Sequence, residues 1–128
     1  MQAWTDGAFT SRGEKRVAAG GVWYGVANGR NKKVAVGGHL TAPRAELAAV
    51  TYAIETDERS LCVRSDSRWV VDGISRKMSL YRARAWFKRP LRAEPVVDHD
   101  LWRRVSRAID RRAAADLTTR AEWVKGHA

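Results

Sequence analysis

The sequence has little cysteine, little proline and no long apolar run. With Cys62 as the single cysteine among 128 residues, no disulfide can form within the chain, which argues against a disulfide-stabilised secreted scaffold. No run of about 18 apolar residues occurs, so no membrane-spanning helix is expected. The first residues, MQAWTDGAF, lack the basic and apolar regions of a secretory signal. These absences predict a soluble cytoplasmic protein without a membrane partner.

Acidic residues are also in the minority. The chain has 14 Asp and Glu against 24 Lys and Arg, which gives a formal net charge of +10. A surface this basic attracts polyanions, and nucleic acid is the commonest such partner. Charge alone does not distinguish nucleic acid from an acidic protein. The length fits one domain, over residues 1–128.

The hydrophobic pattern changes period along the chain. It predicts three antiparallel strands, then a helix, a strand, two helices and a last strand. Asn28-Gly29 between two β-prone runs is a hairpin signal, and the polar stretch 10–16 is expected to be a loop. This order predicts an α/β fold with a mixed sheet. The expected strands cover residues 2–9, 18–27, 33–40, 61–66 and 117–125, and the expected helices cover 43–57, 68–77 and 98–112. Thr41 is the expected cap of the first helix. The last helix has one apolar stripe, formed by Leu101, Trp102, Val105, Ala108 and Ile109.

Three carboxylates stand where strands or helices begin, end or pack. Asp6 lies within a strand, where an aspartate is unfavourable unless something stabilises it. Glu46 lies near the start of a helix, and Asp66 closes the strand LCVRSD. Each has a structural alternative: a turn former, a helix-dipole partner and a helix cap, respectively.

In a sheet fold, these three positions can converge at one edge. Clustered carboxylates repel one another unless a cation lies between them, and hard oxygen ligands suit Mg²⁺ or Mn²⁺. Two such ions can activate water and stabilise a leaving oxygen in phosphodiester hydrolysis. Asp6, Glu46 and Asp66 are therefore candidate metal ligands.

Five ordered motifs resemble the type 1 ribonuclease H family. They are TDGAF around Asp6, TAPRAEL around Glu46, RSDSRWVVDGI around Asp66, DLW at 100–102 and EWVKGHA at 122–128. The resemblance implies a five-stranded mixed sheet, an antiparallel meander followed by parallel strands, flanked by helices. It implies an endonuclease that hydrolyses the RNA strand of an RNA–DNA hybrid with two Mg²⁺ or Mn²⁺ ions. It further implies that Asp6, Glu46 and Asp66 are catalytic and that His127 assists proton handling or product release.

The sequence departs from the family pattern at two places. The family has a fourth carboxylate on a C-terminal helix after the KGHA segment, whereas this sequence stops at Ala128. If the sequence is complete, we expect one metal to bind more weakly, with reduced activity and a preference for Mn²⁺. Ala42 and Pro43 replace amides that contact nucleic acid in the family. Thr41 keeps a predicted substrate contact, and Arg44 is either a phosphate contact or a surface charge.

A basic segment with interleaved aromatic residues lies between Arg76 and Arg92. No acid occurs within it, so we expect phosphate contacts from its cations and packing of its aromatic faces on sugars or bases. It resembles the basic protrusion of cellular family members, and Trp86 is the preferred contact. A solvated helix and loop with docked aromatics is the structural alternative. The predicted nucleic-acid contacts here are Arg76, Lys77, Arg82, Arg84, Trp86, Lys88 and Arg89.

Two other functions fit parts of the pattern. A non-catalytic or weakly active hybrid-binding module of the same fold would explain the missing fourth acid. A DNA-cutting integrase or resolvase would also use an acid cluster, but EWVKGHA and the basic segment favour the ribonuclease. A general architectural DNA binder would not need Asp6 inside a strand.

Overall fold

The computed structural model describes residues 1–12, 15–24, 32–35, 41–87 and 95–125, with side chains except at 6–12, 15–21 and 32–35. Five strands form one sheet in the order β3-β2-β1-β4-β5. The strands are β1 (Gln2–Arg12), β2 (Lys15–Trp23), β3 (Lys32–Ala35), β4 (Leu61–Ser65) and β5 (Thr119–Trp123). The pairs β1–β2 and β2–β3 are antiparallel, whereas β1–β4 and β4–β5 are parallel. The predicted fold class, an antiparallel meander followed by parallel strands, is confirmed.

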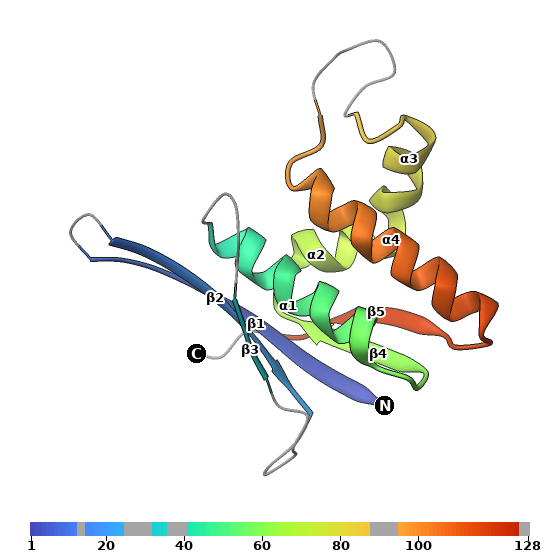
Figure 1. Ribbon diagram of the computed structural model, residues 1–128, viewed down its shortest axis with the longest axis horizontal. Coiled ribbons are helices and arrows are strands. Elements are labelled where there is room, and N and C mark those ends of the chain that lie inside the picture. The colour runs from blue at the N-terminus through green and yellow to red at the C-terminus, as the bar shows by residue number, and fades with distance from the viewer. Residues whose placement is uncertain (13–14, 25–31, 36–40, 88–94, 126–128) are drawn as a thin grey trace.

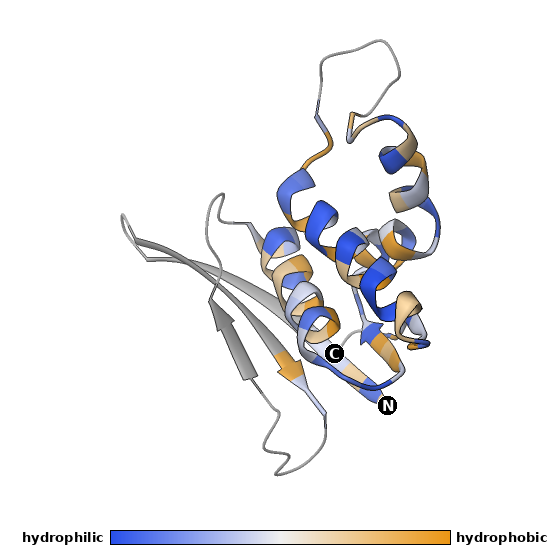
Figure 2. Ribbon diagram, turned by 45° about the vertical axis from the view of Figure 1, so that its right-hand side comes forward, coloured by the Kyte–Doolittle hydropathy of each residue, from blue (hydrophilic) through white to orange (hydrophobic). Residues whose placement is uncertain are grey.

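The helices lie together on one face of this sheet (Figures 1 and 2). They are α1 (Ala42–Thr56), α2 (Arg68–Asp72), a π-helical turn η1 (Gly73–Lys77), α3 (Met78–Ala83) and α4 (His99–Ala114). Alternation along the strands explains the two faces of the sheet. Ala3, Thr5 and Val63 are buried on the helical side, whereas Trp23 on the opposite side is 45% exposed. No described helix is long and apolar enough to cross a membrane.

The core lies between the sheet and helices α1 and α4. Small residues such as Ala45, Ala49 and Ala53 let α1 pack closely on β1 and β2. The predicted apolar stripe of α4 is confirmed, because Leu101, Trp102, Val105 and Ala108 are all buried. Gly73 has room for no side chain, since a Cβ there would lie 2.2 Å from the Trp102 ring.

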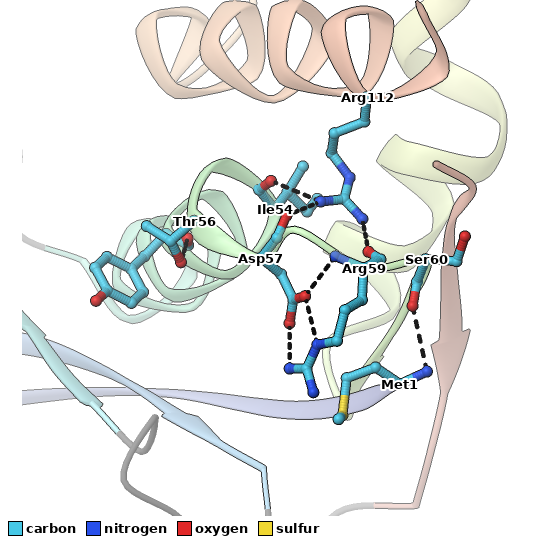
Figure 3. Close-up of polar contacts among 8 residues, drawn as sticks. Met1, Ile54, Thr56, Asp57, Arg59, Ser60 and Arg112 are labelled. Atoms are coloured by element: carbon cyan, nitrogen blue, oxygen red, sulfur yellow. Dashed lines mark hydrogen bonds and ion pairs between the residues drawn. The ribbon is translucent and has the colours of Figure 1, made fainter. Parts of the chain in front are cut away.

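Arg112 of α4 binds the end of α1 and the loop that follows it (Figure 3). Its guanidinium is buried and donates hydrogen bonds to the backbone carbonyls of Asp57 and Arg59. It also donates to the Thr119 hydroxyl at 2.8 Å. Burial lowers the pKa of Arg112. The carbonyls at and beyond the end of a helix have no N–H partner within that helix. The Arg112 side chain supplies the donors for two of them here.

Two expectations about element boundaries need correction, and a third lies where the structure is not described. The stretch 10–16, expected to be a loop, is mostly strand, because β1 reaches Arg12 and β2 begins at Lys15. Cross-strand pairing continues to Arg12 and Lys15, so ladder hydrogen bonds override the polar composition. The single helix expected over 68–77 is α2 followed by η1, and helical structure continues through α3 to Ala83. The Asn28-Gly29 turn lies outside the described residues.

Candidate active site

Asp6 and Asp66 follow two residues that face each other on parallel strands. Thr5 of β1 and Ser65 of β4 are partners in the register of these strands. The next residues along the two strands are Asp6, which β1 continues through, and Asp66, which follows the end of β4. The topology thus brings two acids 60 positions apart in sequence to one edge of the sheet. Asp6 pairs with Gly21 within a ladder, which rules out the turn-former alternative.

Glu46 comes to the same edge from helix α1. Its side chain is only 4% exposed, and its Oε1 accepts hydrogen bonds from the Thr5 hydroxyl at 2.8 Å and the Ser65 hydroxyl at 2.6 Å. Glu46 is the fifth residue of α1, whose first turn holds no acid. The helix-dipole alternative therefore does not explain its position, and the two hydroxyls fix the carboxylate against the strands.

Asp66 is exposed and is not the cap of the following helix. Ser67 takes that position, because its side chain accepts a hydrogen bond from the backbone N–H of Val70 at 3.4 Å. The Asp66 carbonyl accepts a hydrogen bond from the Trp123 indole at 3.1 Å. The backbone at Asp66 is therefore anchored to β5, while its carboxylate is left to face solvent.

Thr5 and Ser65 were not predicted as part of the site. Each directly precedes one of the predicted aspartates, and each uses its hydroxyl to orient the third acid. The sequence offers one signal for them, namely that a polar residue at a buried strand position needs a hydrogen-bond partner. Among the described side chains, no group of three His, Cys, Asp or Glu residues surrounds a common point. The side chain of Asp6 lies outside that description, and so does all of His127.

Arg44 lies in a partly buried network of ion pairs that joins the starts of α1 and α4. Its guanidinium donates to Asp100 at 2.7 and 2.9 Å and to Asp98 at 2.9 Å. The hydrogen bond to Asp100 raises the pKa of Arg44, and the same bond lowers the pKa of Asp100 to about 2. The structure therefore gives Arg44 a structural partner, and its predicted phosphate contact competes with these bonds.

Thr41 begins α1 as expected. Its hydroxyl accepts a hydrogen bond from the backbone N–H of Arg44 at 3.2 Å, which is the geometry of a helix cap. The cap role is confirmed. The predicted substrate contact of Thr41 stays a prediction.

The basic segment has acidic neighbours in space that its own sequence lacks. Arg76 pairs with Asp72 at 3.4 Å, and Arg82 pairs with Asp110 of α4 at 3.1 Å. All four side chains are at least 44% exposed, so these pairs are screened by water and leave room for phosphate. Lys77 is exposed and Arg84 is half-buried. Lys88 and Arg89 lie outside the described residues.

Trp86, the preferred aromatic contact, is half-buried and packs against the core. Its backbone has a φ of 70° and is fixed by two hydrogen bonds, from its N–H to Tyr81 O at 2.7 Å and from Val96 N–H to its carbonyl at 2.9 Å. Phe87 beside it is 38% exposed. The aromatic part of the segment is thus partly docked on the core, as the structural alternative held, with Phe87 facing solvent.

Solved structures of similar shape are ribonuclease H domains. The RNase H domain of prototype foamy virus superposes with a TM-score of 0.73 at 21% identity, over 98% of this chain and 79% of that one. The foamy viral protease-reverse transcriptase in complex with an RNA/DNA hybrid gives a TM-score of 0.74 at 17% identity, over 94% of this chain and 17% of that one. At these identities the likeness shows the fold.

Curated relatives extend the likeness to sequence. Ribonuclease H of Alkalilimnicola ehrlichii is 35% identical over 132 aligned residues, which cover 99% of this chain and 82% of the relative. Ribonuclease H of Aromatoleum aromaticum is 34% identical over 100% of this chain and 79% of the relative. Ribonuclease H of Anaeromyxobacter dehalogenans is 42% identical over 69% of this chain, which corresponds to 45% of that protein.

The fold, the acid-bearing edge of the sheet and these relatives define the chain as a nuclease, an enzyme of the hydrolase class. More specifically, the chain belongs to the RNase H family, whose model matches residues 1–128.

Proposed function

We propose that this protein is an endonuclease that hydrolyses the RNA strand of RNA–DNA hybrids, with Asp6, Glu46 and Asp66 as its catalytic carboxylates. One observation carries the proposal: the carboxylate of Glu46 is buried and is oriented by Thr5 and Ser65, the residues next to the two aspartates. Burying an acid costs free energy, and an apolar residue would fill the same space in the core without that cost. The buried acid in this basic chain therefore points to a role beyond packing. The RNA–DNA hybrid is the substrate that its relatives' name implies.

The donor set fits hard divalent cations. The acids offer carboxylate oxygens, and Glu46 is held in one orientation by its two hydroxyl partners, which favours ligation by a fixed oxygen. Asp6, Glu46 and Asp66 would hold the ions. Mg²⁺ or Mn²⁺, when bound, supplies Lewis-acid activation of water and stabilisation of the leaving oxygen.

The chain's own residues perform the remaining steps. In this proposal Asp66, exposed beyond β4, faces the scissile phosphate, and Glu46 is the buried carboxylate beside it. His127 is proposed to carry a proton to or from the reacting oxygens. The exposed cations Arg76, Lys77 and Arg82 bind the backbone of the hybrid, and Phe87 offers an exposed ring beside them. Thr41, Arg44, Arg84, Trp86, Lys88 and Arg89 complete the proposed contact surface.

The test is incubation of the purified chain with a labelled RNA–DNA hybrid in Mg²⁺ and, separately, in Mn²⁺. Duplex DNA and duplex RNA serve as substrate controls, and Asp66→Asn is the loss-of-function variant. Asp116→Asn is the matched control, because Asp116 is an exposed aspartate between α4 and β5, at the end of β5 away from Asp66. Asparagine also tolerates the φ of 59° at this position.

We expect cleavage of RNA in the hybrid alone, lost in Asp66→Asn and kept in Asp116→Asn. Hybrid binding without cleavage in either metal would contradict the catalytic proposal and leave a binding module of the same fold.

A further inference from the structure

A stacked arginine lies beside Asp66, at the edge of the sheet that carries the acids. Arg68, the first residue of α2, places its guanidinium carbon 4.0 Å from the centre of the Trp123 ring. The Trp123 ring is held in turn by the hydrogen bond from its indole N–H to the Asp66 carbonyl. Trp123 ends β5 and is the register partner of Ser65, which donates to Glu46. The stack is therefore built onto the same backbone that positions the acids.

Arg68 differs from the other stacked arginines of the described chain. Arg59 lies 5.9 Å from the Tyr24 ring and is also bound to Asp57, and Arg64 lies 5.6 Å from the Trp4 ring with Glu122 at 3.9 Å. Arg68 makes the shortest of these contacts and forms no ion pair with any described residue. Its positive charge is exposed and lies two residues along the chain from the exposed Asp66.

Stacking on a ring uses the flat face of a guanidinium and leaves its N–H edge available. That edge forms a rigid fork of donors which matches the oxygens of a phosphate. The ring also restricts the rotamers of the arginine, so less conformational entropy is lost when an anion binds. The anion that suits this fork, in a chain that handles nucleic acid, is a backbone phosphate.

We propose that Arg68, held by Trp123, binds the backbone phosphate next to the one that is cleaved. Arg68 is two residues from Asp66, so the phosphate within its reach neighbours the phosphate at the carboxylates. This inference rests on the proposed function. Arg68 is a substrate-binding residue in it, and Trp123 is the residue that positions it.

Equilibrium binding of the hybrid, measured by fluorescence anisotropy without divalent metal, separates binding from turnover. The variants are Arg68→Gln, Arg68→Lys and Trp123→Leu. Arg111→Gln is the matched control, because Arg111 is an exposed arginine near the end of α4, and it likewise forms no ion pair with a described residue. Arg111 precedes the first residue of β5, whereas Trp123 is the last residue of that strand, so the control lies at the other end of β5 from the stack.

We expect Arg68→Gln to weaken binding roughly threefold to tenfold at low salt. The slope of log K against log salt should fall by about one, as for the loss of one phosphate contact. Arg68→Lys should retain part of the affinity because it keeps the charge but not the fork. Trp123→Leu should weaken binding in wild-type protein and have little further effect in Arg68→Gln.

An Arg68→Gln variant that matches Arg111→Gln in both affinity and salt slope would overturn the proposal. Loss of thermal stability with an unchanged salt slope would also overturn it, since that is the signature of a purely structural stack. If wild-type protein cleaves the hybrid while these binding differences are absent, only this inference fails. If wild-type protein neither binds nor cleaves, the proposed function itself fails.

Discussion

At the scale of single residues, the site depends on hydroxyl groups as much as on carboxylates. Ser65 donates to Glu46 at 2.6 Å and accepts the backbone N–H of Ser67 at 3.0 Å, so one side chain links helix α1 to the turn that carries Asp66. A buried carboxylate that loses one of its donors becomes less fixed and less well solvated. The orientation of Glu46 therefore follows from its neighbours on β1 and β4.

We expect Ser65→Ala to lower kcat by roughly tenfold to a hundredfold, with a smaller change in KM. The physical reason is that Glu46 loses one of its two orienting donors, so the chemical step is affected more than substrate binding. Steady-state hydrolysis of the hybrid measures both constants.

Ser60→Ala is the matched control for this variant. Ser60 also uses its hydroxyl to accept a backbone N–H, that of Thr118 at 3.1 Å, but it lies at the opposite end of β4. Ser65→Thr keeps a hydroxyl and should restore part of kcat. Equal rates for Ser65→Ala and Ser60→Ala would contradict a positioning role.

At the scale of elements, the starts of α1 and α4 are joined by Arg44, Asp98 and Asp100. The Arg44 and Asp98 side chains are 9% and 7% exposed, whereas Asp100 is 57% exposed. Asp98 holds a left-handed backbone with a φ of 57° just before α4 begins. This contact joins the start of α4 to the start of α1.

The pH dependence of stability follows from the lowered pKa of Asp100. The pKa of Asp100 is about 2 in the folded state and about 4 in the unfolded chain. Its ionised form therefore stabilises the fold at any pH above about 4, and this stabilisation is lost as the pH falls toward 2. We expect Asp100→Asn to be less stable than wild type at neutral pH and to converge with it near pH 2. Because Asp100 is more than half exposed, solvent screening keeps the difference small.

Urea unfolding at several pH values between about 2 and about 7 measures this difference. Asp116→Asn should run parallel to wild type over the range, because Asp116 is exposed and has no ion-pair partner among the described residues. A constant offset between Asp100→Asn and wild type at every pH would show that the ionised carboxylate does not contribute.

At the scale of the whole molecule, local patterns predicted most of the architecture. The period change between residues 40 and 43 and the apolar stripe of Leu101, Trp102, Val105 and Ala108 both predicted elements that the structure contains. Composition failed at the β1–β2 hairpin, where pairing extends strands through a polar stretch. The partners of Arg44 were beyond prediction because they lie 54 and 56 positions away.

The same contrast holds for the site. Asp6 drew notice because an acid is unfavourable in a strand interior, whereas Glu46 and Asp66 became candidates only as members of the set and through the motifs around them. Thr5 and Ser65 look like ordinary strand residues until the register pairs them beneath Glu46. The stack of Arg68 on Trp123 joins residues 55 positions apart and depends on β5 lying beside β4.

The protein as a whole combines a net charge of +10 with three acids, Asp6, Glu46 and Asp66, that we propose meet at one sheet edge. Repulsion among those acids costs stability when no cation is bound, and any ion that binds only the folded state must raise stability by mass action. We expect Mg²⁺ to stabilise the chain by about 1.4 kcal/mol when its free concentration is ten times its Kd, which raises Tm by a few degrees. Thermal unfolding with and without Mg²⁺, at equal ionic strength, measures the shift.

The sign of the Asp66→Asn effect makes this prediction specific. Without Mg²⁺ the variant should be at least as stable as wild type, because one repelling charge has been removed from the edge. With Mg²⁺ it should be the less stable of the two, because the ion has lost a ligand. Asp116→Asn should keep the full Mg²⁺ shift. An equal Mg²⁺ shift in wild type and in Asp66→Asn would mean that the ion acts elsewhere on the surface, and that Asp66 does not bind it.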